Sequence, residues 1–330
     1  MTARQDRPAT GPRLGWLLAW LALSVALVAA IRATPWARAS EVLLRQDARW
    51  AALAVALNLA ILPLWAAEWV RLAPAAERPD RRRTLAVVAL TSATLNTIPF
   101  FAGEATAVVL LVAHAGLSRA GALALLALDQ LLVGVAKLAV IAAAALLSPL
   151  PVWLRGGVAA LVVAVVVAGA ALFTAARRRR PAAPAERLAW IERWSARLDA
   201  LRDPRRLAAV LALALLKKGA EVAAVIAAQR AVGIELPWWS AVLVVAALGV
   251  GTLVPVAPGN LGTYEASAFV VYRSLGVPPH EALGLAIVQH LYFLVPAVGT
   301  GYLLLTVRQL RPRTERREVP LATPEAATRS

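Results

Sequence analysis

Residues 96–104 read Asn-Thr-Ile-Pro-Phe-Phe-Ala-Gly-Glu, and residues 255–265 read Pro-Val-Ala-Pro-Gly-Asn-Leu-Gly-Thr-Tyr-Glu. Each stretch places helix-breaking proline and glycine and one carboxylate, Glu104 or Glu265, inside a strongly apolar region. Breaks and charges at bilayer depth cost free energy, so they are seldom structural filler. Interrupted segments at corresponding places in two halves of a membrane protein are also a sequence sign of a transporter-type binding site. The two stretches therefore predict a pair of broken helices around one site.

The composition predicts an all-α polytopic membrane protein. The chain is 60% hydrophobic, its mean hydropathy is +0.67, and several apolar runs approach or exceed the roughly 20 residues that cross a bilayer as a helix. The net charge of +16 comes from basic residues beside the apolar runs, as in the cytoplasmic flanks of membrane helices, so we expect no nucleic-acid partner. The absence of cysteine excludes disulfides and thiolate metal sites.

Six apolar runs are long enough for full spans, and four shorter pieces form two pairs around the breaks. The spans are expected at about 14–31, 50–70, 118–147, 152–175, 207–232 and 282–307. Each pair is predicted to be a re-entrant helical hairpin, although the first arm of the second pair is long enough to span by itself. The hairpins comprise 85–98 with 105–115 and a tip at 99–104, and 238–256 with 263–275 and a tip at 258–262.

Basic residues set the expected orientation. They concentrate in segments that all fall on the cytoplasmic side if the hairpins do not cross, and both termini are cytoplasmic in this scheme, as the positive-inside rule requires of an inner-membrane protein. An odd number of crossings then separates the two hairpins, which predicts an inverted repeat with halves at about 50–147 and 207–307. The whole is one transmembrane domain over 14–310, with a cytoplasmic N-terminus at 1–13, an interfacial helix at about 185–203 and a disordered cytoplasmic tail at 311–330.

The breaks supply most of the residues expected to line a substrate path. Glu104 and Glu265 can act in either of two ways. As caps, they accept hydrogen bonds from the backbone N–H groups of the following half-helix. As functional groups, they contact a cationic head group or bind a proton. The other expected path residues are Asn96, Pro99, Gly103, Asp129, Pro258, Gly259, Gly262 and His290.

Charged residues within the spans are expected to neutralise one another or to take part in the path. Asp129 and Lys137 share one face of a helix approximately, and Lys217, Lys218 and Glu221 have the spacing of helical ion pairs. His290 is either a hydrogen-bonded core residue or a proton relay, and Glu68, at the end of a span, is expected to reach the interface. HExxH, GxSxG and Walker A motifs are absent from the sequence, so we expect no enzymatic activity, no cofactor and no metal.

The order and spacing of these motifs resemble the transmembrane region of lysylphosphatidylglycerol synthases, a flippase-like family. The resemblance covers about 49–305 and rests on Asn96…Pro99…Gly103-Glu104, on Gly116-Leu-Ser…Ala122 leading to Asp129, and on Pro255…Pro258-Gly259…Gly262…Glu265 followed by Gly276-Val-Pro. It implies movement of a lipid between leaflets, with membrane lipids as the partner and a homo-oligomer as an open possibility.

Two departures from the family pattern limit what the resemblance implies. The aminoacyl-transfer domain of the synthases has no counterpart, so lysyl transfer is not expected. Positions that are often basic in the family hold Phe101, Ala107, Tyr264 and His290, which implies a different lipid or none. The expected function is therefore that of a lipid flippase or translocator, and the alternatives are a secondary carrier for a small solute or ion and a non-transporting accessory to a membrane glycosyltransferase pathway.

Overall fold

The computed structural model describes residues 41–149 and 203–310, except 43, 99–101 and 254–256, together with four isolated positions between the two ranges. Those four positions, 156, 160, 163 and 167, are helical and fall within the span expected at 152–175. The span expected at 14–31, the N-terminus, almost all of the interfacial helix, the tail and Pro99 lie outside the described residues.

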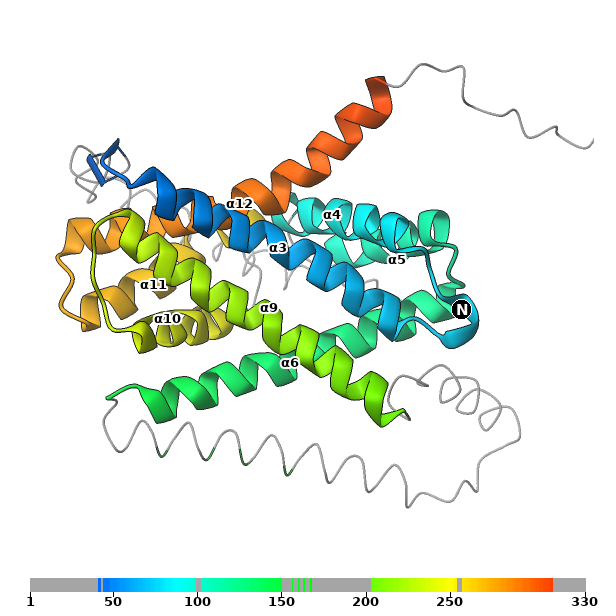
Figure 1. Cartoon of the computed structure of the whole chain (residues 1–330), viewed down its shortest axis with the longest axis horizontal. Coiled ribbons are helices and arrows are strands. Elements are labelled where there is room, and N and C mark those ends of the chain that lie inside the picture. The colour runs from blue at the N-terminus through cyan, green and yellow to red at the C-terminus, as the bar shows by residue number, and fades with distance from the viewer. Residues whose placement is uncertain are drawn as a thin grey trace, which may run out of the picture.

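The described residues form eight α-helices and two short 3₁₀ turns, without a β-strand among them (Figure 1). The first half contains α3 (Ala48–Leu72), η1 (Ala75–Glu77), α4 (Arg81–Thr97), α5 (Ala102–Ala115) and α6 (Arg119–Leu147). The second half contains α9 (Pro204–Ala231), α10 (Trp238–Gly251), η3 (Pro258–Asn260), α11 (Thr263–Ser274) and α12 (Pro279–Leu310). The prediction of an all-helical protein is confirmed for this part of the chain.

Side-chain caps fix where four of the long helices begin. The carboxylates of Asp47, Asp80 and Asp203 accept hydrogen bonds from backbone N–H groups in the first turns of α3, α4 and α9, and the Ser118 hydroxyl does so for α6. These groups satisfy donors that a helix start leaves without intrahelical partners. The caps explain why α4 starts at Arg81, earlier than the apolar run 85–98 alone suggests.

Three of the described helices are long and apolar enough to cross a membrane, at Ala48–Leu72, Arg119–Leu147 and Pro279–Val307. They coincide with spans expected at 50–70, 118–147 and 282–307. The span expected at 207–232 corresponds to α9, a helix of 28 residues whose middle carries three charged side chains, Lys217, Lys218 and Glu221. Because these three helices are too apolar and too long to be ordinary surface helices, the chain is a membrane protein.

Each expected hairpin is a pair of consecutive helices that pack on one another, α4 with α5 and α10 with α11. In the first pair, a Cβ added to Gly103 would lie 2.3 Å from Leu95 Cδ2, so the arms approach too closely for a larger residue. In the second pair, the arm expected at 238–256 is shorter than predicted, because α10 ends at Gly251 with Thr252 as its C-cap. Its 14 residues rise about 21 Å, less than the hydrocarbon thickness of about 30 Å, so this arm cannot span by itself.

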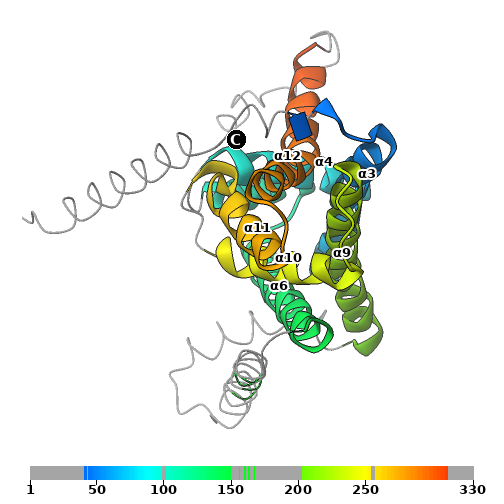
Figure 2. The same ribbon diagram turned by 90° about the vertical axis from the view of Figure 1, so that its left-hand side faces the viewer.

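Helix contacts in the two halves correspond when α3, α4, α5 and α6 are matched with α9, α10, α11 and α12. Helix α4 packs on α12 as α10 packs on α6, α3 packs on α4 as α9 packs on α10, and α3 packs on its own counterpart, α9. The Asp47 N–H donates to Ala231 O over 2.8 Å, and the Arg206 guanidinium donates to Arg71 O and Ala73 O. The start of each of α3 and α9 thus lies beside the end of the other, and the two helices run antiparallel (Figures 1 and 2).

The absence of a side chain at Gly301 allows α12 to approach α4 closely, and this predicts how substitutions there change the free energy of unfolding. A Cβ at Gly301 would lie 2.5 Å from Ala93 Cβ and 2.7 Å from Ala89 O, whereas a Cβ at Gly299 would meet nothing within 4 Å. We expect Gly301→Ala to lower the free energy of unfolding by about 1–3 kcal/mol through overpacking, and Gly299→Ala to leave it unchanged or raise it slightly. Melting temperatures in detergent micelles test this, and equal shifts for the two variants would contradict it.

Candidate functional site

The turn between α10 and α11 rests against the end of α4. Gly259, Asn260 and Gly262 have φ values of +60°, +56° and +86°, which lie in the left-handed region that favours glycine. Gly259 is buried, and a Cβ there would lie 3.1 Å from Asn96 O and 3.1 Å from a methyl group of Leu294. The second broken stretch therefore contacts the first, and the close backbone approach requires glycine at position 259.

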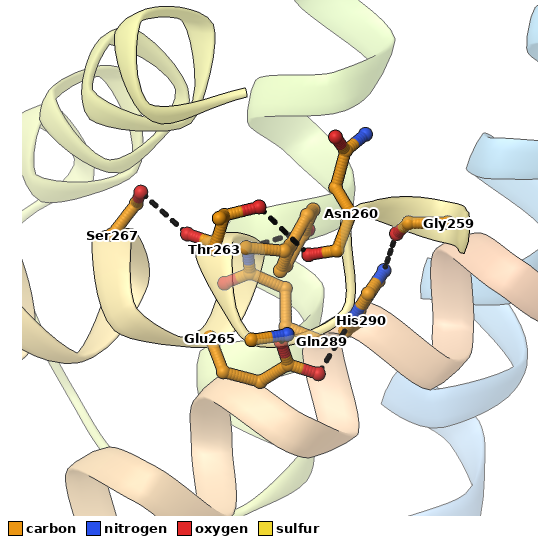
Figure 3. Close-up of polar contacts among 9 residues, drawn as sticks. Gly259, Asn260, Thr263, Glu265, Ser267, Gln289 and His290 are labelled. Carbon is orange, nitrogen blue, oxygen red and sulfur yellow. Dashed lines mark hydrogen bonds and ion pairs between the residues drawn. The ribbon is translucent and has the colours of Figure 1, made fainter. Parts of the chain in front are cut away.

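Glu265 and His290 hold this turn in place (Figure 3). The Gly262 N–H donates to Glu265 Oε2 over 2.7 Å, so Glu265 is the helix cap that the sequence allowed. Its other oxygen, Oε1, lies 2.7 Å from His290 Nδ1, and His290 Nε2 lies 2.9 Å from Gly259 O. His290 is 1% exposed and joins α12 to both ends of the turn. It is the hydrogen-bonded core histidine that was one of the two predictions for this residue.

Aromatic and amide side chains fix the plane of the His290 ring. The Tyr264 ring stacks on it with a centroid distance of 4.0 Å and an interplanar angle of 7°, and Phe293 lies beyond at 6.2 Å. The Gln289 amide donates to the Tyr264 hydroxyl over 2.9 Å and accepts from the Tyr272 hydroxyl. Three of these residues, Tyr264, Gln289 and Phe293, also border the cavity described next.

A cavity of about 180 Å³ adjoins the turn, and two lysines and one glutamate are among its lining residues. Lys218 and Glu221 form the predicted ion pair, with an Nζ–Oε2 distance of 2.6 Å. Lys137 faces the same cavity, and no described residue forms a hydrogen bond or ion pair with it. The polar lining comes from five helices, the η3 turn and the C-cap of α10, namely Asn58, Lys137, Lys218, Glu221, Thr252, Asn260, Tyr264 and Gln289.

A second polar cluster is buried between α3, α6 and α9. Lys217 forms an ion pair with Glu68, which is fully buried, and lies 5.8 Å from the centroid of the Trp65 ring. The Trp65 indole N–H donates to Asp129 Oδ1 over 3.2 Å. Two predictions are corrected here: Glu68 does not reach the interface, and Asp129 contacts α3 and not Lys137. The predicted grouping of Lys217 with Glu221 is likewise replaced by Lys217 with Glu68, because α3 packs directly on α9.

The structure unites only part of the predicted site. Asn96, Gly259, Gly262, Glu265 and His290 meet at the second turn, whereas Asp129 belongs to the buried cluster. Glu104 lies in the first turn of α5 and is not among the described residues that line the cavity; its Oε2 is buried without a hydrogen-bond partner. Within the described residues, no group of three or more His, Cys, Asp or Glu side chains is placed to hold a metal ion.

None of the residues expected to line the path is among the described residues that line the cavity, and two of the groups that do, Asn58 and the Lys137 ammonium, lie far from the broken stretches in the sequence. Their distance along the chain from residues 255–265 hides the connection, and only the packing of α6 on α10 and of α3 on α9 and α12 brings them together. The spacing of Lys137 on an amphipathic face was a signal that it points inward, but its neighbours could not be inferred from that spacing.

Comparison with known protein families identified a match. A sequence model of the family described as lysylphosphatidylglycerol synthase TM region matches residues 16–301, which is most of the chain. No curated protein and no solved structure matched.

Proposed function

The chain belongs to the lysylphosphatidylglycerol synthase transmembrane family, and from that premise we propose that it is a lipid translocator of the inner membrane. The observation that carries the proposal is the close approach of Gly259 to Asn96 O beside a cavity that Lys137, Lys218 and Glu221 line. A head group crosses through this cavity and past the two turns, while the acyl chains stay in the surrounding lipid. No cofactor enters this scheme.

The proposed architecture is an inverted repeat with two re-entrant hairpins. Its support is the matching set of helix contacts in the two halves and the antiparallel packing of α3 on α9. Helices α5, α10 and α11, with 14, 14 and 12 residues, are too short to cross the hydrocarbon core. Hairpins that enter from opposite faces and end against each other leave only a thin barrier between the two sides, as in other carriers with inverted repeats.

Lipid transfer in proteoliposomes tests the proposal. The full chain is reconstituted into vesicles of phosphatidylethanolamine and phosphatidylglycerol that carry a trace of lipid labelled on its acyl chain with a reducible fluorophore. An impermeant reductant then quenches only the outer leaflet, so transfer appears as loss of fluorescence beyond one half. We expect such loss with the protein and not in protein-free vesicles, and intact inner-leaflet fluorescence with both lipids would contradict the proposal.

Lys137 faces the cavity and has no ion-pair partner among the described residues, which predicts a preference among head groups. We expect Lys137→Gln to slow the transfer of phosphatidylglycerol about 10-fold, which corresponds to a loss of about 1.4 kcal/mol, because the anionic phosphate loses its cationic partner. The transfer of phosphatidylethanolamine, whose own ammonium offsets the phosphate charge, should slow less. Lys137→Arg is the matched control and should keep the wild-type preference; equal slowing of both lipids by Lys137→Gln would exclude this role.

The volume of the cavity supports one alternative, a secondary carrier for a small solute or ion. A cavity of about 180 Å³ has room for a few water molecules, which suits a small solute without a lipid tail. Uptake of a labelled solute into the same vesicles without any lipid transfer would favour this function over lipid translocation.

A further inference from the structure

We propose that Glu265 and His290 form a proton-binding site, and that the bound proton holds the η3 turn closed against α4. The existence of this site does not depend on what the protein transports. The use of the site, to couple proton binding to opening of the path, rests on the proposed function.

The hydrogen-bond partners of His290 require an additional proton. Nδ1 faces a carboxylate oxygen of Glu265 at 2.7 Å, and Nε2 faces the carbonyl oxygen of Gly259 at 2.9 Å. An ionised carboxylate and a carbonyl can only accept hydrogen bonds, whereas a neutral imidazole has a single N–H to donate. With Glu265 ionised and His290 neutral, one of the two contacts would oppose a nitrogen lone pair to an oxygen lone pair in a position that is 1% exposed.

Both contacts become hydrogen bonds in two protonation states of the pair. In one, a doubly protonated imidazole lies beside a carboxylate; in the other, an imidazole protonated on Nε2 accepts from a carboxylic acid. The two states contain the same number of protons and have the same net charge of zero, so they form one proton-bound state. Loss of this proton leaves a buried polar group without a partner, which costs about 1–3 kcal/mol.

The groups around the pair do not offer a substitute for this proton. On α11 the Tyr264 ring stacks on His290, the Tyr272 hydroxyl donates to Gln289, and the Arg273 guanidinium donates to Val277 O. Helix α3 faces the adjoining cavity with the neutral Asn58. Lys218 and Glu221 on α9 are paired with each other, and Lys137 on α6 lies in the same cavity. The α10 sequence has no titratable side chain, and the only charges of α4, Arg81–Arg83, lie at the end opposite Asn96.

Loss of the proton therefore weakens the attachment of the turn. Among the described side chains, His290 is the one that hydrogen-bonds to Gly259 O, through its Nε2. Gly259 is also the residue that lies against Asn96 O at the end of α4. Without that bond the η3 turn is free to leave α4, and the stacked Tyr264 ring, which borders the cavity, moves with it. When the pair is protonated, the site favours contact between the η3 turn and α4. When the pair is deprotonated, the site favours their separation.

Distance measurements between the two turns test the inference in the full chain. The chain has no cysteine, so Ile98→Cys and Leu261→Cys, which replace side chains that are 45% and 54% exposed, allow specific spin labelling in lipid nanodiscs. We expect one short distance in acidic buffer and a shift to longer distances in alkaline buffer. Glu265→Gln should keep the short distance at every pH, because the Gln amide donates to Nδ1 while Nε2–H donates to Gly259 O.

Two outcomes would overturn the inference: a wild-type distance that does not change with pH, and a Glu265→Gln distance that still does. A second measurement guards against a local effect of the labels. The chain has three histidines, so ¹⁵N-histidine spectra of the His114→Gln, His280→Gln variant report His290 alone. We expect its ring nitrogens to titrate together with the distance change; a neutral His290 beside an ionised Glu265 while the turns are in contact would refute the site. A pH-dependent distance without lipid transfer would instead refute the proposed function.

Discussion

Glu265→Gln is expected to reduce lipid transfer by about 100-fold or more, the equivalent of losing about 3 kcal/mol, while the protein stays folded. The Gln side chain can still accept from the Gly262 N–H and donate to His290 Nδ1, so the cap and the attachment of α11 to α12 persist. What is lost is the ability to release a proton, and the turn stays in contact with α4. Transfer in proteoliposomes measures the loss, and the melting temperature in detergent verifies the fold.

Glu104→Gln is expected to abolish transfer as well, because Glu104 is the corresponding carboxylate of the first broken stretch and its Oε2 is buried without a hydrogen-bond partner among the described residues. Glu235→Gln, which changes an exposed carboxylate in the loop between α9 and α10, is the matched control and should transfer lipid at the wild-type rate. Wild-type transfer by the Glu104→Gln, Glu265→Gln double variant would refute the assignment of both carboxylates to the path.

The largest expected loss of stability follows from Lys217→Met. Lys217 is the cation within ion-pair distance of Glu68, and the Glu68 side chain is fully buried. Removing one partner of a buried ion pair leaves an uncompensated charge and typically costs about 3–5 kcal/mol. The neighbouring Lys218→Met removes a pair whose side chains are 17% and 30% exposed, so it should cost about 1 kcal/mol or less.

Unfolding in mixed detergent micelles distinguishes these two lysine variants by the midpoints of their unfolding transitions. The Glu68→Gln, Lys217→Met double variant should recover part of the lost stability, because it removes the unpaired charge together with its partner. Equal destabilisation by Lys217→Met and Lys218→Met would show that the buried cluster does not stabilise the bundle as described.

The sequence was informative where local chemistry determines the structure. The span expected at 118–147 corresponds to α6, which begins directly after the Ser118 cap, whereas the Asp80 cap starts α4 earlier than its apolar run indicated. Proline and glycine in the two stretches indicated breaks, and the Gly262–Glu265 spacing allowed the helix cap that is observed. The family resemblance, carried by the same residues, is confirmed by the match over residues 16–301.

Contacts between distant segments could not be predicted in the same way. The partner of Lys217 is Glu68 and not its neighbour Glu221, because α3 and α9 pack side by side. Local spacing suggested Lys137 as the partner of Asp129, yet the residue that donates a hydrogen bond to Asp129 is Trp65 on another helix. The length of α10 was overestimated because hydrophobicity continues past Gly251, where the helix ends.

The central claim is that two hairpins enter the bilayer from opposite faces and meet at their turns, and site-directed labelling tests it most directly. Single cysteines replace Ala76, in the loop before α4, Glu235, in the loop before α10, and Ile98 and Leu261 at the turns. An impermeant thiol reagent is applied to intact spheroplasts and to inverted vesicles. We predict labelling of Glu235→Cys only from outside, of Ala76→Cys only from the cytoplasmic face, and protection of both turns at acidic pH. Labelling of Ala76→Cys and Glu235→Cys from the same face, or of both turns from water under those conditions, would contradict the account.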